Sequence, residues 1–420
     1  MKRHSSPLVS HEATPTSIRL CQGCELPVDV LDVKQGKSAH CPRCGTQLYR
    51  GGSPSLSGNL AISITCLLLL FPAHFFDFIK IRLFGVMIPA TLPSGVFTLL
   101  QEGFYFLSLL IIFCSSIAPF LVCSSVTGAH FALKIRSFKL LKWSLKTVHH
   151  LKHWVMIDVF LVSVAISCFK LQDYSDIFVG PGLYSLLLLQ LFTVLLLSRV
   201  SVRRYWEAWD QEKNYQFEKK EIHCHSCHLS QPEGEQCIRC HSPLHHRKPR
   251  SLQKTWAYLI AATIAIFPAN LIAISVLLTN GQRLQDTIFS GVASLVKSGM
   301  TGIAIIIFVA SIVVPVAKIC GLAYILLAIK FKRSVYHRQR MTIYFLVKWI
   351  GKWSMMDLFV ISIMMTLLDR GQILDFTPGY GAVAFGMVVV LTMLAAESID
   401  PRFIWDNYPQ PSEKEETLNE

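Results

Sequence analysis

Long apolar stretches alternate with shorter polar segments along most of the chain. Eight of the apolar stretches have the length, about 17–25 residues, that a membrane-spanning helix requires. They lie near residues 58–79, 104–127, 153–169, 182–200, 255–278, 301–329, 345–368 and 379–398. The pattern predicts an all-α polytopic membrane protein with eight transmembrane helices. No cleavable signal peptide is recognisable in the polar N-terminal segment.

The second half of the chain repeats motifs of the first half. A shift of 196 residues carries Pro72 of "LFPAH" onto Pro268 of "IFPAN". A shift of 199 residues aligns "HWVMIDVF" at 153–160 with "KWSMMDLF" at 352–359. Each half contains four predicted helices, and an even number gives both halves the same orientation in the membrane. We therefore expect two parallel four-helix repeats, with a shared site near their interface.

Polar and Cys-bearing segments separate the apolar regions into domains. The predicted organisation is a disordered arm at 1–20, a metal ribbon at 21–50, a transmembrane repeat at 55–205, a second ribbon at 220–246, a second transmembrane repeat at 251–405 and a disordered tail at 406–420.

The distribution of charge predicts the orientation of the chain. The sequence is 52% hydrophobic, only 16% charged, and has a net charge of +13. Of the loop residues, 23 Lys and Arg lie in 128–152, 200–254 and 330–352, against six in 80–103, 170–181, 279–299 and 369–378. By the positive-inside rule, the basic loops and both termini are cytoplasmic. The basic excess thus indicates topology and anionic-lipid contact rather than nucleic-acid binding.

Eight of the thirteen cysteines form four CxxC pairs in two segments. The first segment holds Cys21, Cys24, Cys41 and Cys44, and the second holds Cys224, Cys227, Cys237 and Cys240. Two CxxC turns complete a tetrahedral four-thiolate site, which is closed and therefore structural. We expect two structural zinc ions, with iron in a rubredoxin-like site as the alternative. Redox-active pairs are a weaker interpretation, because two pairs occur together in each segment.

Polar side chains also lie inside the predicted helices of the second half. Lys318 and Asp357 are both predicted about 12–15 Å from the cytoplasmic side, at 1.5 Å per residue. A buried charge is costly without a partner, so we predict that they pair. Ser354 shares the helix face of Asp357, and Ser311 shares that of Lys318, while Thr392 lies at a compatible depth.

The first half differs from the second at the positions that correspond to this polar cluster. Asp158 corresponds to Asp357, but Val122 stands where Lys318 does and Val155 stands where Ser354 does. A purely structural pair would be equally useful in both halves, so the difference favours a functional cluster in the second half. A structural clasp is the alternative. For the secondary candidate, Asp158, the structural interpretation is favoured.

The sequence contains no motif of an energy-coupling or hydrolytic enzyme. GxxxxGK[ST], HExxH and GxSxG motifs do not occur. We therefore expect a protein that is not an enzyme and that draws energy, if it needs any, from an ion gradient, a partner or mass action.

The paired ribbons and the motifs "SLQK", "FPAN" and "W(S)M.D.F" resemble the paraquat-inducible protein A family over residues 20–408. The resemblance implies a multi-pass protein of the bacterial inner membrane that works with a periplasmic MCE-domain protein. It also implies lipid transport, with the polar cluster at Ser311, Lys318, Ser354, Asp357 and Thr392. It implies neither the direction of transport nor the preferred lipid.

We therefore expect a component that loads or unloads phospholipid-like substrates for an MCE-domain partner, with proton coupling through the Lys318–Asp357 pair. Three alternatives stay open on the residues. One is a membrane anchor or assembly platform that transports nothing, the second is an ion or drug carrier, and the third is a membrane-bound redox protein with iron in its ribbons. The oligomeric state does not follow from the sequence.

Overall fold

The computed structural model describes residues 18–30, 33–34, 36–52, 55–83, 86–171, 176–210, 222–279, 282–297, 299, 301–333, 335–368 and 374–406. The chain forms two compact units. One consists of Met1–Ser53 and Asp210–His246, and the other of Pro54–Trp209 and Arg247–Glu420. The predicted arm at 1–20 and tail at 406–420 lie largely outside the described residues.

The smaller unit carries all four CxxC turns. Its described part contains the antiparallel strand pairs β1 (Ile18–Leu20) with β2 (Pro27–Asp29), β3 (Ser38–His40) with β4 (Gln47–Arg50), and β8 (Ile222–His223) with β9 (Ser230–Gln231). The backbone N–H of Leu20 donates a 3.2 Å hydrogen bond to Oγ of Ser230. The two Cys-bearing segments, distant in sequence, therefore contact each other in one unit.

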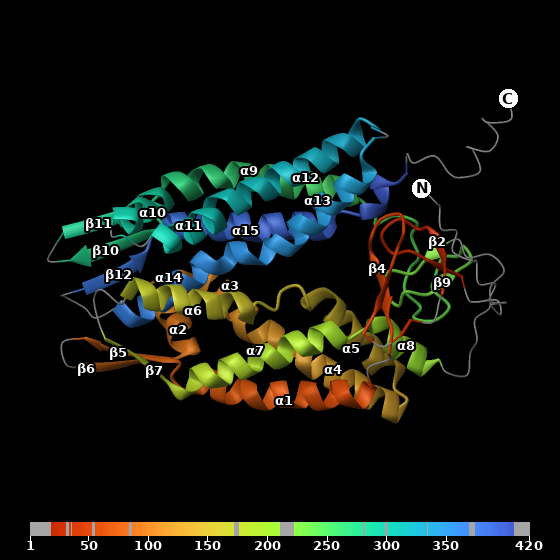
Figure 1. Ribbon diagram of the computed structural model, residues 1–420, viewed down its shortest axis with the longest axis horizontal. Helices are drawn as coiled ribbons and strands as arrows, with labels where there is room; N and C mark the ends of the chain where they lie inside the picture. Colours follow the sequence, from red (N-terminus) through yellow and green to blue (C-terminus); the bar gives the residue numbers. More distant parts are fainter. Residues whose placement is uncertain are drawn as a thin grey trace, which may run out of the picture. The chain divides into compact units, whose positions relative to one another are not determined.

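The larger unit is helical, and its order of elements occurs twice (Figure 1). The first series is α1 (Leu56–Phe75), β5 (Ile79–Leu83), β6 (Val86–Ala90), α2 (Leu92–Gln101), α3 (Tyr105–Ile112), η1 (Phe113–Ile117), α4 (Ala118–Ile135), α5 (Phe138–Leu151), α6 (Ile157–Leu171), β7 (Asp176–Val179), α7 (Pro181–Arg199) and α8 (Val202–Trp209). The second is α9 (Ser251–Leu271), β10 (Ser275–Thr279), β11 (Gln282–Asp286), α10 (Ile288–Lys297), α11 (Thr301–Phe308), η2 (Val309–Val313), α12 (Val314–Lys330), α13 (His337–Ile350), η3 (Gly351–Met355), α14 (Met356–Leu368), β12 (Leu374–Pro378), α15 (Tyr380–Ser398) and η4 (Pro401–Ile404).

Six segments of this unit are long and apolar enough to cross a membrane. They are Leu56–Phe75, Tyr105–Ile135, Pro181–Arg199, Thr301–Lys330, His337–Leu367 and Tyr380–Ser398. The predicted spans at 153–169 and 255–278 are not among them. The first corresponds to α6, which has only 15 residues. The second corresponds to α9, which has 21 residues but includes polar side chains in its first turns. The chain is thus a mostly helical membrane protein with six candidate spans among the described residues.

Each half carries a small antiparallel sheet of three strands, in which the first strand along the chain lies in the centre. The first sheet is β6-β5-β7 and the second is β11-β10-β12. Both lie at the same end of the helical bundle, on the left in Figure 1. These strands were not predicted from the sequence, because each is only four or five residues long and lies close to an apolar helix.

A π-helical turn interrupts the corresponding helix of each half just before a proline. The turns η1 and η2 immediately precede α4 and α12, whose second residues are Pro119 and Pro315. Proline has no N–H to donate and its ring clashes with the preceding turn, so the α-helical hydrogen-bond pattern cannot continue there. The N–H of Val314 instead bonds to the carbonyl of Val309. Such turns are frequent at functional sites.

The predicted helix at 345–368 is not continuous. The α-helix α13 ends at Ile350, the 3₁₀ turn η3 covers Gly351–Met355, and α14 begins at Met356. Asp357 therefore lies in the first turn of a helix rather than in its middle. Positive partial charge at a helix N-terminus stabilises a carboxylate, which gives a physical reason for an acid at this depth.

Helices α6 and α14 pack against each other between the two halves. Oγ of Ser163 in α6 donates a 3.0 Å hydrogen bond to the carbonyl of Met356 in α14. The rings of Phe160 and Phe359 meet edge to face with centroids 5.5 Å apart. The two helices that begin beside Asp158 and Asp357 thus form part of the interface between the halves.

A serine caps the short helix of each half. The N–H of Thr91 donates to Oγ of Ser94 at 3.1 Å before α2, and that of Thr287 donates to Oγ of Ser290 at 2.9 Å before α10. These contacts satisfy backbone donors that a helix leaves open at its start. They explain why the tripeptide "SGV" occurs at both places, 196 residues apart.

The glycines after these serines provide a matched pair of sites. A Cβ on Gly95 would lie 2.6 Å from both Oγ of Ser362 and Oγ1 of Thr366, whereas a Cβ on Gly291 would meet nothing within 4 Å. We predict that Gly95→Ala destabilises the protein by about 1–3 kcal/mol through overpacking of α2 against α14. Gly291→Ala leaves stability equal or higher, because alanine favours helix. Thermal unfolding in detergent measures both, and equal melting temperatures would contradict the close α2–α14 packing.

Candidate functional site

The eight predicted cysteine ligands come together as two groups of four. Within each group the candidate ligand atoms all lie within 4.8 Å of one another. The Sγ–Sγ distances are 3.4 Å for Cys21–Cys44 and 3.6 Å for Cys24–Cys41. In the second group they are 3.6 Å for Cys224–Cys240 and 3.5 Å for Cys227–Cys237. These separations are far too long for disulfides and close to those of four thiolates about 2.3 Å from a tetrahedral ion.

Each CxxC turn has the same backbone geometry. The residue after the second cysteine has a positive φ in all four turns: Glu25 at 59°, Gly45 at 74°, His228 at 60° and His241 at 49°. Its N–H donates back to the carbonyl of the first cysteine at 2.9–3.0 Å. This hydrogen bond folds the turn so that both thiols point to one side. All eight cysteines are buried.

The donor set fits a metal ion. Hydrogen bonds from Cys21 and Cys24 lower the pKa of the Cys44 thiol, and those from Cys224 and Cys227 lower the pKa of Cys237. A set of four converging buried thiols is repulsive when ionised and is stabilised by a cation. In the part of the chain that the structure describes, these two four-Cys sets are the groups that could hold a metal. Four protein ligands leave no open position, so the ion would hold the fold rather than react.

The second candidate site is the polar cluster inside the second half. Lys318 is only 2% exposed, and its Nζ donates a 2.8 Å hydrogen bond to Oγ1 of Thr392. Thr392 is itself fully buried and donates to the carbonyl of Val389 at 3.0 Å. Two members of the polar cluster, Lys318 and Thr392, are therefore in direct contact, and their hydrogen bond joins α12 to α15. Among the described residues, the recorded partner of Lys318 is this hydroxyl, so its ion pair with Asp357 stays a prediction.

The other three members lie on elements that pack around this hydrogen bond. Ser311 is in the π turn η2, where its Oγ donates to the carbonyl of Ile307 at 2.7 Å. Ser354 is in η3, and its buried hydroxyl has no hydrogen-bond partner among the described residues. Asp357 follows in the first turn of α14. The turn η3 contacts η2, α12 and α15. The irregular segments of the second half therefore meet at the predicted cluster.

The corresponding place in the first half is apolar. Val122, at the position of Lys318, and Val155, at that of Ser354, are buried together with Ala118 in a hydrophobic cluster. Asp158 lies in the first turn of α6, as Asp357 does in α14. The two halves thus share the acid at the start of a helix and differ in what is packed beside it.

A cavity lies next to the Lys318–Thr392 hydrogen bond. Its volume of about 40 Å³ is roughly three times what one water molecule needs. The polar lining consists of His153, Lys318, Lys348, Lys352, Thr392 and Glu397. Val347, Gly351, Met393 and Ala396 complete the walls. The cavity therefore combines an excess of basic groups with an apolar surface, and it receives His153 from the first half.

A family model described as Paraquat-inducible protein A matches residues 56–210 and 252–409. The two segments cover most of the chain and correspond to the two halves of the helical unit. The chain belongs to the paraquat-inducible protein A family. No solved structure matches it.

Relatives in this family are similar over nearly the whole chain. The Escherichia coli K12 protein named "Lipophilic envelope-spanning tunnel protein A" is 37% identical over 92% of this chain and 90% of its own length. A Haemophilus influenzae "Probable intermembrane transport protein" is 33% identical over 96% and 99%. The E. coli K12 "Intermembrane transport protein PqiA" is 30% identical over 95% and 97%.

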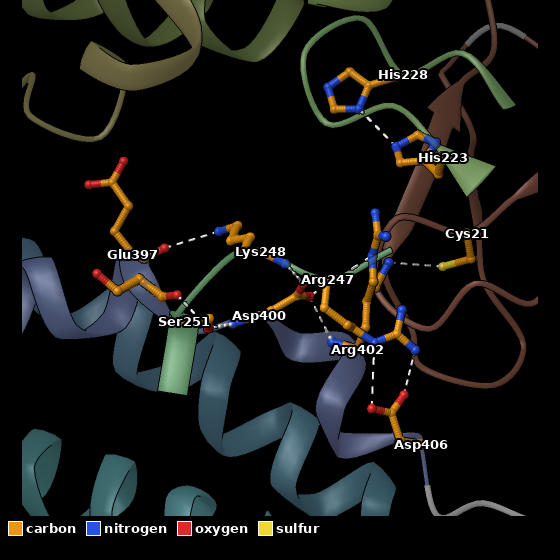
Figure 2. Close-up of polar contacts among 12 residues, drawn as sticks. Cys21, His223, His228, Arg247, Lys248, Ser251, Glu397, Asp400, Arg402 and Asp406 are labelled. Carbon is orange, nitrogen blue, oxygen red and sulfur yellow. Dashed lines mark hydrogen bonds and ion pairs between the residues drawn. The ribbon is translucent and has the colours of Figure 1, made fainter. Parts of the chain in front are cut away.

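In this member of the paraquat-inducible protein A family, a further polar network lies where α9 begins and α15 ends (Figure 2). Nζ of Lys248 donates to the carbonyl of Glu397 at 3.1 Å, and its N–H donates to Oδ2 of Asp400 at 3.0 Å. Oγ of Ser251 donates to the carbonyl of Ser398 at 2.8 Å and accepts from the N–H of Asp400 at 3.0 Å. These contacts cap the C-terminus of α15 and join it to α9.

Sequence reasoning missed this network. The signal that could have found it is the pair of polar segments "KPRS" and "ESIDPR", which flank apolar helices. Burial lowers the pKa of Lys248, and the carboxylates of Asp400 and Glu397 partly offset that effect. The Arg402 guanidinium lies 3.9 Å from Asp400, and both side chains are at most 2% exposed.

Asp400 and the more exposed Asp406 form a matched pair for testing the network. Asp400→Ala would leave the buried guanidinium of Arg402 without this carboxylate, and we predict a loss of about 3–5 kcal/mol of stability. Asp406 pairs with Arg247 at the surface, so Asp406→Ala should cost at most about 1 kcal/mol. Thermal unfolding of both variants in the same detergent measures the difference. Equal losses would show that Asp400 has no special structural role.

Proposed function

We propose that this protein is an inner-membrane transport component that loads or unloads phospholipid-like molecules for a periplasmic MCE-domain partner. The observation that carries the proposal is the buried Lys318–Thr392 cluster with its adjoining cavity, set among apolar helices. Intramembrane ionisable groups in transport proteins line substrate paths or relay protons. The names of the relatives support the same reading, since two of them are intermembrane transport proteins.

The irregular helices suit a site that handles a polar group inside a membrane. Non-helical backbone at membrane depth is tolerated where it is buried in protein or lines a water-filled cavity. The second half has two such places, η2 and η3, and they contact each other. Interrupted helices are typical of substrate sites in transporters. The two halves act as parallel repeats in this proposal.

Asp357 acts as the switch in the proposed mechanism. While ionised, its carboxylate is stabilised by the N-terminus of α14 and attracts the ammonium group of Lys318. Proton uptake removes that attraction and leaves Lys318 on the hydroxyl of Thr392, the arrangement in which it lies here. When Lys318 exchanges one partner for the other, the favoured position of α12 relative to α14 changes. This change couples lipid passage to the proton gradient. Asp158 plays no such part, because buried valines stand at the positions that correspond to Lys318 and Ser354.

The remaining features complete the proposed architecture. α6 and α9 join the six candidate spans, which makes eight crossings and places both termini and the ribbons in the cytoplasm. The two four-Cys groups hold zinc as a structural ion, in preference to iron. The protein has no enzymatic activity of its own, and its partners are the MCE-domain protein and phospholipid.

The test uses cells that lack this protein and its relatives and therefore have a leaky outer envelope. Wild type, Lys318→Ala and Asp357→Asn are expressed at matched membrane levels, with Asp158→Asn as the control from the equivalent position. The proposal predicts that barrier function is restored by wild type and Asp158→Asn but not by the two cluster variants. Full restoration by folded cluster variants would instead favour an assembly platform that transports nothing. Restoration by Asp357→Asn alone would remove the proton switch and leave transport standing.

A further inference from the structure

The cavity beside Lys318 has an excess of positive charge. Three ammonium groups line it, those of Lys318, Lys348 and Lys352, against the single carboxylate of Glu397. Lys348 and Lys352 are half-buried, and the ammonium group of Lys348 lies 6.0 Å from the centroid of the Tyr344 ring. Three ammonium groups against one carboxylate leave an excess of positive charge in the cavity, and such an excess favours an anionic ligand.

The first half adds further positive charge to the same place. Lys152 precedes His153 at the start of the segment that leads into α6, and burial lowers the pKa of the Lys152 ammonium. His153 itself lines the cavity, so both halves of the chain contribute to its wall.

An unused hydrogen-bond donor lies in the turn that forms one wall. Gly351 and Lys352 line the cavity, and Ser354, two residues further along η3, is 1% exposed with a hydroxyl that has no hydrogen-bond partner among the described residues. The α-helix α14 follows at Met356, whose own N–H is already bonded to the carbonyl of Trp353. Hydroxyl and amide donors together with ammonium groups are the partners that phosphate oxygens take.

We propose that this cavity is a phosphate-binding subsite that takes the phosphodiester of a phospholipid headgroup. The charge and donors match a phosphate group, and lysine is a point-charge partner for phosphate. Val347, Met393 and Ala396 supply an apolar wall on which the glycerol end of a lipid can lie. The inference rests on the proposed transport of phospholipid. Free inorganic phosphate has the same chemistry and is the other possible source of the anion.

The test measures binding to the purified, delipidated full-length chain in detergent. The probes are a short-chain phosphatidylglycerol, the diacylglycerol with the same chains, and inorganic phosphate. Lys348→Gln/Lys352→Gln removes two cavity charges, and Lys330→Gln/Lys332→Gln removes two exposed charges at the end of α12 as a matched control. Lys348→Arg/Lys352→Arg keeps the charge and should bind like wild type. Elution volume and circular dichroism verify folding of every variant.

The proposal predicts at least a tenfold weaker affinity for phosphatidylglycerol in the cavity variant and no change in the control, with charge-assisted hydrogen bonds of the usual strength. Millimolar inorganic phosphate should displace the lipid from wild type. Equal binding of diacylglycerol, or equal losses in both glutamine variants, would overturn phosphate recognition. Binding of inorganic phosphate without binding of the lipid would overturn the lipid as its source. If phosphate recognition fails while the cavity variant still restores the envelope barrier, the transport function stands without this subsite.

Discussion

Replacing Cys227 with serine is expected to remove one of two metal ions and to unfold the second ribbon. Cys227 is fully buried, and its Sγ lies 3.5 Å from that of Cys237 within a closed four-Cys group. Structural zinc contributes on the order of 10–16 kcal/mol in small domains, because the folded state binds the ion and the unfolded state does not. Metal analysis of the purified chain should give two ions for wild type and one for Cys227→Ser.

Cys320→Ser is the matched control for this experiment. Cys320 is an exposed cysteine of α12 outside both groups, so its replacement should leave two ions bound. A chelator should reproduce the unfolding of the ribbons in wild type, and acid should do the same, since the thiolate ligands must lose the ion when they are protonated. Iron with visible absorbance in place of colourless zinc would correct the identity of the ion. Two ions in Cys227→Ser would contradict the four-Cys sites.

Lys318→Met is expected to abolish transport while it leaves the fold as stable as before or more so. Lys318 is 2% exposed and its ammonium has a single recorded partner among the described residues, Thr392. An apolar side chain of similar volume needs no counter-charge, so desolvation of an ammonium group no longer opposes folding at this position. Loss of a charge-assisted hydrogen bond to substrate should reduce transport at least tenfold. Barrier function is measured in the cells that express each variant, and the melting temperature is measured on the protein purified from those cells.

This pairing of readouts separates a functional lysine from a structural clasp. If the lysine is a structural clasp, its replacement lowers stability and barrier function together. If it is functional, barrier function is lost while stability stays equal or rises. Lys330→Met, at the exposed end of the same helix, is the control that removes a charge without touching the cluster. A folded Lys318→Met protein with wild-type barrier function would contradict the role given to Lys318.

Local chemistry made the metal sites predictable from the sequence. A CxxC turn brings two thiols together by itself, so the pairs Cys21–Cys24 and Cys224–Cys227 identify their sites before any tertiary contact is known. The structure then adds what spacing cannot give, namely that Leu20 of the first ribbon bonds to Ser230 of the second. Whether the two ribbons touch depends on their surface side chains, and the spacing of the cysteines carries no information about these.

The position of a residue along its helix can be counted from the sequence, but the direction of its side chain around the helix cannot. Similar positions along their helices led to the expectation that Lys318 pairs with Asp357. The structure shows the ammonium group bonded to Thr392, and the ion pair stays a prediction. A helix turns by about 100° per residue, so an interruption of a few residues rotates everything beyond it. The 3₁₀ turn at Gly351–Met355 is such an interruption, and no proline marks it in the sequence.

The difference between six candidate spans and eight predicted ones has a similar origin. Hydropathy identifies a long apolar run well, but α6 is only 15 residues long because Lys152–Met156 form a turn instead of helix. The polar side chains Gln253 and Lys254 in the first turn of α9 reduce its mean hydropathy. In the order of elements, α6 of the first half nevertheless corresponds to α14 of the second, and α9 of the second half corresponds to α1 of the first.

Site-specific photocrosslinking from the cavity is the most direct test of the central claim that phospholipid enters the site beside Lys318. A photoreactive amino acid replaces Met393, which lines the cavity, or Met387, which is 47% exposed on the same helix. Cells labelled with radioactive phosphate then report crosslinked phospholipid at each position. A lipid adduct is expected at Met393 and should disappear in Lys318→Met, whereas an adduct at Met387 should not change. No adduct at Met393, or one that persists in Lys318→Met, would contradict it.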